Sequence, residues 1–275
     1  LQFGRSITEV NTLLSDTDSI SGLTEEVRRL SREFGQSNVT SAQALYGTIS
    51  AGASTAEQAV TILTEANKLA QIGVTDVNTA LNAVQPALNA YGKGAESAAD
   101  FSALLFQTVR DGRTTIPELS ASLGQVTPLA AAAGVEFDQL LSSIAALTKG
   151  GLTTSQAVTQ VRAILSALLK PTSDAAKAAS ELGIEFNSAA LRSKGLAGFL
   201  QELQERASGN SDVMARLFGQ VEALSGALAL TGSGAEDFVQ ILDNMTQAGD
   251  SAAQALEKVQ KDPGQAIARF TSELQ

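Results

Sequence analysis

Apolar residues recur at helical spacing along almost the whole chain. One such run is Leu119, Leu123, Val126, Ala130 and Ala133, in which each step is three or four residues. This spacing places the apolar side chains on one face of an α-helix. The strict alternation of a half-buried strand never persists. The sequence therefore predicts an all-α fold of short amphipathic helices.

Glycines divide the helical pattern. Four times a glycine is followed by a hydrophobic residue and then by a capping or acidic residue, which is typical of one helix ending and the next beginning. The four turns are Gly73-Val74-Thr75, Gly134-Val135-Glu136, Gly151-Leu152-Thr153 and Gly183-Ile184-Glu185. Because 23 glycines and 5 prolines interrupt the pattern, we expect a multi-turn helical domain and not one continuous rod.

The spacing and the turns together predict where the helices lie. The expected helices cover residues 24–34, 41–50, 55–72, 76–91, 95–110, 116–133, 137–149, 154–169, 173–182, 195–207, 211–230, 235–247 and 251–261. Capping boxes, in which a hydroxyl and a side chain three residues later satisfy exposed N–H groups, mark four starts. They are Thr40/Gln43, Ser54/Glu57, Thr115/Glu118 and Thr153/Gln156.

The core is expected to consist of thin layers. Hydrophobic residues make up 44% of the 275 residues, but 45 residues are alanine and none is tryptophan. Alanine favours helix and has almost no side chain to bury, so helices can approach closely. Nine aromatic residues lie on apolar helical faces, and we interpret them as core anchors: Tyr46, Tyr91, Phe101, Phe106, Phe137, Phe186, Phe199, Phe218 and Phe238.

Both ends of the chain differ from its middle. Heptad-like helices are predicted at each end, from Phe3, Ile7, Val10 and Leu14 and from Leu256, Val259, Ile267, Phe270 and Leu274 across Pro263. We predict N-terminal helices and a hinge in residues 1–35, the hinge falling at residues 16–22. A helical core domain follows in residues 36–232, and C-terminal helices in residues 233–275 lead into a longer chain. Because the first residue is Leu and not Met, we expect a fragment or a processed piece, and no signal peptide is recognisable.

The absence of His and Cys removes many kinds of catalytic and metal site, because imidazole or thiolate groups supply those sites. Three carboxylate pairs have the composition that a glycosidase needs, but solvated helix faces explain them better. The pairs are Glu25/Glu26, Glu202/Glu205 and Glu236/Asp237. Residues 16–18, Asp-Thr-Asp, lack the downstream Gly and Glu of a calcium loop, and the glycine-rich segments follow no predicted strand. The sequence thus predicts no enzyme: catalytic residues none, cofactor-binding residues none, metal-binding residues none.

The charges of the sequence oppose binding to nucleic acids, and their scarcity in one segment has two possible interpretations. Lys and Arg number 19 and Asp and Glu 29, a formal net charge of −10, which opposes nucleic-acid binding because phosphates need basic partners. Between Ser37 and Gly92 the charged residues are Glu57, Glu65, Lys68 and Asp76. Either this segment is an Ala-rich fold with low surface charge, or partner subunits cover several of its faces. Residues 119–135, which are strongly apolar, fit an ordinary core better than membrane contact.

An ordered set of short motifs resembles the core of phage tail tape measure proteins. The match covers about residues 33–249. The motifs are Ala44-Leu45-Tyr46-Gly47-Thr48-Ile49-Ser50-Ala51-Gly52, Asn89-Ala90-Tyr91-Gly92, Glu118-Leu119-Ser120, Ala133-Gly134-Val135-Glu136-Phe137, Ala146-Leu147-Thr148-Lys149-Gly150-Gly151, Arg162-Ala163-Ile164-Leu165, Leu169-Lys170-Pro171-Thr172, Glu181-Leu182-Gly183-Ile184 and Arg216-Leu217-Phe218-Gly219.

The resemblance implies a structural scaffold in the tail lumen of a virion, made in the bacterial host cytoplasm during assembly. In that family a few copies associate, tail-tube subunits polymerise around them, the scaffold sets tail length, and the protein is expelled during DNA delivery. Implied partners are further copies of the chain, tail-tube proteins, baseplate or tail-initiator proteins and tail assembly chaperones, with membrane contact confined to ejection. No cofactor or catalytic residue is implied. A helical adaptor or toxin-delivery or secretion subunit is the alternative, and a peptidoglycan-active helical enzyme fits less well.

Overall fold

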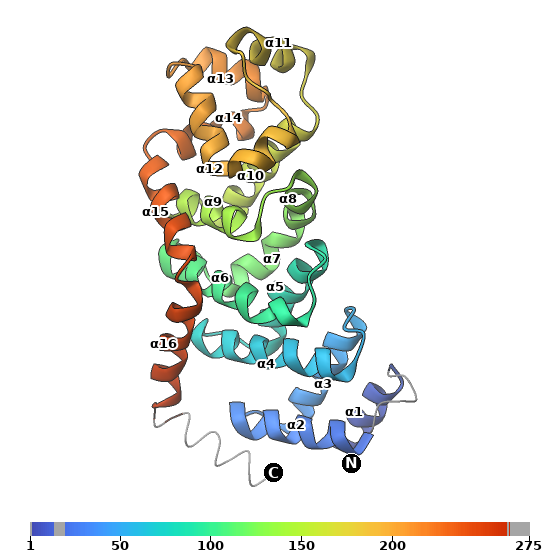
Figure 1. The fold of residues 1–275 in the computed structure, drawn as a ribbon. Coiled ribbons are helices and arrows are strands. Elements are labelled where there is room, and N and C mark those ends of the chain that lie inside the picture. Colours follow the sequence, from blue (N-terminus) through green and yellow to red (C-terminus); the bar gives the residue numbers. More distant parts are fainter. Residues whose placement is uncertain (1, 14–19, 263, 265–275) are drawn as a thin grey trace. The chain divides into compact units, whose positions relative to one another are not determined.

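The computed structural model describes residues 2–13, 20–262 and 264. Within these residues the regular structure consists of sixteen α-helices and two short 3₁₀ helices, without a strand (Figure 1). The prediction of an all-α fold of many short helices is therefore confirmed. The longest helix, α12 (Ser188–Arg206), has 19 residues and is interrupted at Gly195, whose φ is 70°.

The chain forms two compact units. Unit 1 comprises residues 1–106 and 249–275, and unit 2 comprises residues 107–248. The helix α6 (Ala98–Asp111) contributes residues to both units.

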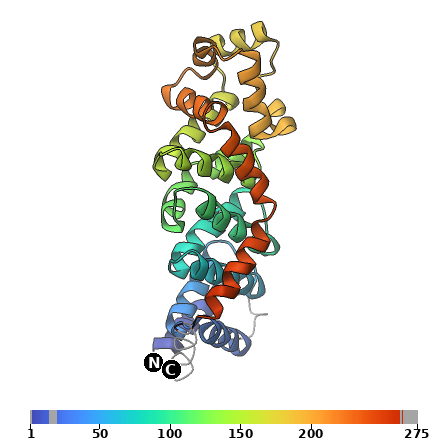
Figure 2. The same cartoon turned by 90° about the vertical axis from the view of Figure 1, so that its left-hand side faces the viewer.

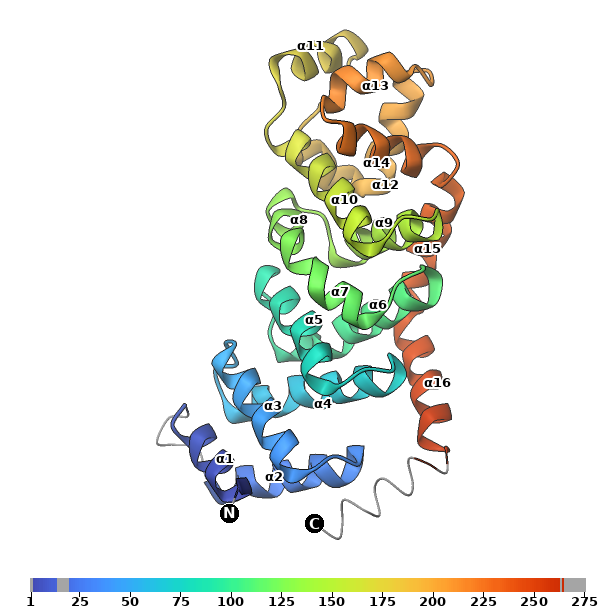
Figure 3. The same cartoon turned by 180° about the vertical axis from the view of Figure 1, so that it is seen from behind.

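Unit 1 is organised around α3. Its elements are α1 (Gln2–Asn11), α2 (Ile20–Phe34), α3 (Asn38–Ser50), α4 (Ala56–Ile72), α5 (Val77–Ala90), η1 (Ala95–Ser97), the first part of α6, and α16 (Ala248–Gln260) from its second residue onward. α3 packs against α1, α2, α4 and α5 (Figures 1 and 3). α16 passes the C-terminal end of α4 (Figures 1 and 2), and Ala248 is its one buried residue.

Unit 2 is organised around α10. Its helices are α7 (Ile116–Ser122), η2 (Leu123–Gln125), α8 (Thr127–Ala133), α9 (Phe137–Lys149), α10 (Thr154–Leu169), α11 (Ser173–Leu182), α12, α13 (Ser211–Phe218), α14 (Val221–Thr231) and α15 (Ala235–Met245). α10 packs against α7, α8, α9, α13 and α14 (Figure 3). Half of its sixteen residues are buried, with Val161, Ile164 and Leu165 fully so.

Among the larger departures from the predicted helices, two are divisions of one helix into shorter ones and one is an extension. The expected helix 116–133 divides into α7, η2 and α8, and Pro128 lies in the first turn of α8, where its missing N–H is tolerated. The expected helix 211–230 breaks at Gly219, whose φ is 65°. The expected helix 195–207 begins earlier, at Ser188, because Asn187 caps an additional short segment before Gly195.

The four predicted capping boxes have different outcomes. Thr153 and Gln156 form a complete reciprocal box at α10. Thr115 caps α7 by accepting a hydrogen bond from the Glu118 N–H. The other two predictions were wrong in register: the caps of α3 and α4 are Ser37 and Thr55.

Two predicted features of the ends lie partly outside the described residues. In the expected hinge at 16–22, residues 16–19 are not described, and residues 20–22 already belong to α2. The C-terminal heptad-like pattern continues through residues 263 and 265–275, which are not described either. α16 ends at Gln260, before them.

Most of the expected aromatic anchors are buried. Those buried are Phe101, Phe137, Phe186, Phe199, Phe218 and Phe238, whereas Tyr91 and Phe106 are half-buried. Phe186 packs against Phe199 and Phe218, with ring centroids 6.1 and 5.7 Å away. Tyr46 contradicts the prediction, because it is 40% exposed on the outer face of α3.

The apolar run 119–135 forms ordinary core, as predicted. Leu119, Val126, Ala130 and Ala133 are completely buried in unit 2. Among the described helices, none is long and apolar enough to cross a membrane.

Candidate functional site

The charge-poor segment of unit 1 presents a stripe of polar residues on α5. Asn78, Asn82, Pro86 and Asn89, which we call the asparagine stripe, are all exposed, and their spacing places them on one side of the helix. Pro86 has no N–H to donate to the Asn82 carbonyl. This backbone oxygen therefore adds an acceptor to the stripe. Because amides cost less to desolvate than charges, the stripe is suited to being covered.

The ends of this stripe are held by specific contacts. Asn89 Nδ2 donates to the Ala51 carbonyl at 2.9 Å, and the buried Gln85 Nε2 donates to the Thr48 carbonyl at 2.9 Å. These bonds fix α5 against the end of α3. At the other end Asp76 caps α5: its carboxylate accepts the Thr79 N–H at 3.0 Å and the Thr79 hydroxyl at 2.6 Å. The hydrogen bonds from Thr79 lower the pKa of Asp76.

In the three carboxylate pairs named from the sequence, the two members have different partners. One member of each lies in an ion pair: Glu26 with Arg29, Glu202 with Lys194, and Asp237 with Lys149. The other members, Glu25, Glu205 and Glu236, are exposed and form no ion pair among the described side chains.

A different exposed ion cluster joins α11 to α13. Arg216 on α13 donates to Glu181 at 2.9 Å and lies within 3.4 Å of Asp174, both on α11. The hydrogen bond from Arg216 lowers the pKa of Glu181. The cluster lies on the surface and stabilises the contact between two short helices.

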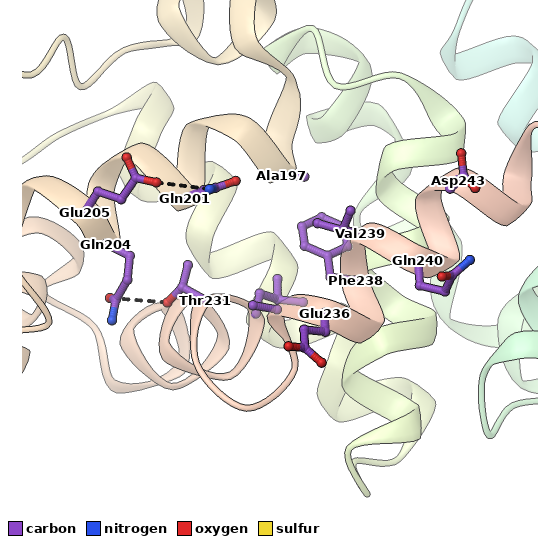
Figure 4. A pocket seen from close by; sticks show the side chains of 12 residues that line it. Ala197, Gln201, Gln204, Glu205, Thr231, Glu236, Phe238, Val239, Gln240 and Asp243 are labelled. Carbon is purple, nitrogen blue, oxygen red and sulfur yellow. Dashed lines mark hydrogen bonds between the residues drawn. The ribbon is translucent and has the colours of Figure 1, made fainter.

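The structure reveals a groove that the sequence did not predict. It has a volume of about 720 Å³ and lies in unit 2 between α12, α14 and α15 (Figure 4). Buried Leu230 and Phe238 contribute to its lining, and Val239 projects at its edge with 55% of its surface exposed. We call it the acidic groove, because Glu205, Glu236 and Asp243 are its charged lining residues.

Two hydrogen bonds orient the α12 side of the acidic groove. Gln201 Nε2 donates to Glu205 Oε1 at 3.0 Å, and the Thr231 hydroxyl donates to Gln204 Oε1 at 3.4 Å (Figure 4). Glu205 and Glu236, which belong to two different carboxylate pairs of the sequence, line the same groove. Its one aromatic lining residue, Phe238, is buried, so the groove offers no exposed ring on which a sugar could stack.

One sequence signal could have indicated this groove. On α15 the apolar residues Phe238, Ile241 and Met245 are buried, and Val239 lies out of phase with them among Glu236, Gln240 and Asp243. A single exposed apolar residue is normal on a protein surface, so this signal points to the groove only together with the packing of α12 and α14 beside it. In the part of the chain that is described, no group of three or more Asp and Glu residues could hold a metal ion.

Comparison with known proteins places the chain in a family. The sequence profile of the phage-related minor tail proteins matches residues 24–219, which is well over half of the chain. The chain belongs to the phage-related minor tail protein family. The match runs through parts of both compact units.

Two relatives of the chain carry the name of tape measure proteins. The "Probable tape measure protein" of Clostridium phage phiCD119 is 30% identical over 269 residues, which are 94% of this chain and 28% of the relative. The "Tape measure protein" of Pneumococcus phage Dp-1 is 29% identical over 208 residues, 70% of this chain and 17% of the relative. The resemblance inferred from the ordered motifs is thereby confirmed. The chain spans less than a third of the length of either relative. No solved structure matches it.

Proposed function

We propose that this minor tail protein chain is a folded helical domain of a tail tape measure protein. It acts as a structural scaffold for tail-tube assembly and contributes to tail length determination, without catalysis. The family match over residues 24–219 is the observation that carries this proposal. The domain would lie in the tail lumen, after assembly in the host cytoplasm, and would be expelled during DNA delivery. We retain residues 36–232 as the core of the tape measure region.

We further propose that a few copies associate through the asparagine stripe. The stripe is exposed and uncharged, and the Asn82 carbonyl lacks its usual donor four residues later because residue 86 is proline. Tail-tube, baseplate or tail-initiator proteins and tail assembly chaperones are the other proposed partners. The net charge of −10 opposes nucleic-acid binding, and membrane contact is confined to ejection.

Deletion of α10 tests whether this segment is a folded domain or a ruler. A ruler would shorten the tail by about 1.5 Å per residue, roughly 24 Å for residues 154–169. In a packed domain the deletion removes fully buried Val161, Ile164 and Leu165. Truncating one such side chain costs about 2–5 kcal/mol, and domains have about 5–15 kcal/mol in total. We expect few or no tails in electron micrographs of lysates.

Two substitutions of unchanged length complete this test. Leu165→Asp places a charge in the core of α10 and should also abolish tails, whereas Arg162→Gln changes an exposed residue of the same helix and should leave tails normal. Intact tails that are about 24 Å shorter after the deletion would show that α10 is part of a ruler.

Self-association is tested by a charge on the asparagine stripe. Thr79 is unsuitable because its hydroxyl and N–H bind Asp76, so we choose Asn82→Lys. The matched control is Thr61→Lys on the exposed face of α4. Light scattering should show fewer oligomers for Asn82→Lys than for the control, with equal helicity by circular dichroism. A monomeric wild-type protein, or equal loss in both variants, would contradict the stripe as the interface.

A further inference from the structure

We infer that the acidic groove of unit 2 binds a cationic amphipathic helix of another protein. The inference concerns a surface that does not depend on the tail-length role. It rests on the juxtaposition of an exposed apolar side chain, a hollow between three helices and three carboxylates without cationic partners.

The charges of the groove are unbalanced. Glu205, Glu236 and Asp243 are exposed, belong to none of the ion pairs of the described chain, and face a groove whose twelve lining residues include no Lys or Arg. Three carboxylates around one hollow repel one another. Figure 4 shows the three carboxylates at separate points along the groove, so Lys or Arg residues spaced along a partner would each be attracted to one of them.

The groove also offers apolar surface to a partner. Val239 is 55% exposed, and directly beside it Phe238 and Leu230 are buried in the lining. Covering Val239 removes apolar surface from water, which favours binding. Small cations would neutralise the carboxylates but would leave the side chain of Val239 exposed to water.

The shape of the groove selects a helix. Its lining extends from Ala197 to Glu205 on α12 and from Ala235 to Asp243 on α15, about 12 Å along each helix, or roughly two turns. A groove between helices accepts the side-chain ridge of another helix. A partner helix with one apolar anchor over Val239 and Lys or Arg residues on either side would match both the floor and the rim.

Charge also decides between possible occupants. A second copy of this chain carries a net charge of −10, so copies are expected to meet at the uncharged asparagine stripe and not at the acidic groove. An anionic membrane surface is repelled by the carboxylates of the groove. A basic protein is attracted. The occupant we infer is therefore a cationic helix of a different protein chain.

The experiment uses the whole chain and a defined probe. The probe is a labelled amphipathic peptide of Leu, Ala and Lys, about 18 residues long so that it can form a helix. A peptide in which Glu replaces every Lys is the control probe. Fluorescence anisotropy should show binding of the Lys peptide, weakening with added salt, and no binding of the Glu peptide.

Matched triple variants assign the binding to the groove. Glu205→Gln, Glu236→Gln and Asp243→Asn together remove its charges. The control removes the same charges elsewhere, by Glu25→Gln, Glu185→Gln and Asp250→Asn, at exposed residues without ion pairs among the described side chains. We expect Kd to rise at least about tenfold in the groove variant and less than about twofold in the control.

A further variant tests the apolar contact. Val239→Ser changes an exposed residue, so the fold should persist, and it should weaken binding of the Lys peptide by about threefold or more. Three results would overturn the inference: no binding of the Lys peptide to the wild type, equal weakening in the two triple variants, or loss of self-association in the groove variant by light scattering. The last result would identify a second copy as the occupant.

Discussion

Val74 shows how one position can depart from its sequence pattern. In the turns at Gly134 and Gly183 the glycine takes the left-handed conformation, at φ 79° and 66°, and the next residue, Val135 or Ile184, is buried. In those two turns the N–H of the residue after the glycine donates to a carbonyl five residues earlier. At the end of α4 the corresponding bond runs from the Thr75 N–H to the Ala70 carbonyl, so its donor lies two residues after Gly73 and not one. Val74 therefore takes the left-handed position, at φ 52°, and is 91% exposed.

Replacing Val74 by glycine should stabilise unit 1. A β-branched residue in the left-handed region costs about 1–2 kcal/mol, and part of that gain is offset by the greater freedom of glycine in the unfolded chain. We expect the free energy of unfolding to rise by about 1 kcal/mol in urea titrations followed by circular dichroism. Gly92→Ala is the converse control, because Gly92 has φ 61° with open space around it, and it should lose about 1 kcal/mol. An unchanged or lower stability of Val74→Gly would show that the left-handed backbone of Val74 is not strained.

Asp76 should make unit 1 sensitive to acid. Its pKa is lowered in the folded protein by hydrogen bonds from the Thr79 hydroxyl and N–H, so folding favours the charged form. The stability that this gives is present above the ordinary pKa of an aspartate, about 4. It is lost as pH falls through the lower pKa of Asp76 in the folded protein. Asp76→Asn keeps an oxygen acceptor but does not titrate. Between about pH 6 and pH 2.5 its free energy of unfolding should fall less than that of the wild type, and an equal fall would contradict this cause.

At the scale of elements, unit 2 is held by the close approach of α10 and α14. A Cβ placed on Gly226 of α14 would lie 3.0 Å from Gln160 Cβ and 3.1 Å from Ile164 Cδ1 of α10. The neighbouring buried residues of α14, Ala223 and Ala227, are also small. This is the thin, Ala-rich packing that composition indicated.

Enlarging Gly226 should separate these two helices. Gly226→Val should destabilise unit 2 by about 1–3 kcal/mol, because overpacking forces side chains and backbone to shift. The control is Gly198→Ala at an exposed position of α12, where the nearest heavy atom would be 3.9 Å away and alanine favours helix by about 1 kcal/mol. In thermal unfolding, the Tm of Gly226→Val should be lower than that of the wild type, and the Tm of Gly198→Ala should be higher. Equal Tm values for Gly226→Val and the wild type would rule out close packing at this position.

At the scale of the whole molecule, the two units differ in chain continuity. Unit 2 is one segment, residues 107–248, whereas unit 1 combines residues 1–106 with residues 249–275. The central helix of unit 2, α10, and its packing partners α7, α8, α9, α13 and α14 all lie within the single segment.

A fragment of residues 107–248 should therefore fold alone. We expect a helical circular dichroism spectrum and one cooperative thermal transition, since a segment with its own core can fold as a unit. Introducing Leu165→Asp into the fragment should abolish that transition, which shows that it reports the core. A fragment without a cooperative transition would show that unit 2 requires unit 1.

The sequence by itself determined the helical class, most helix positions and the family. Caps and glycine turns act between residues about three to six positions apart, which is why Thr153 with Gln156, and Gly134 with Val135, could be read without a structure. The tertiary structure decided what local spacing leaves open. Val239 and Phe238 are neighbours in the chain, yet one is exposed and the other buried. Glu205 and Glu236 line one groove although they lie on different helices. Such proximity depends on how α12, α14 and α15 pack, and packing is set by side-chain fit between distant segments.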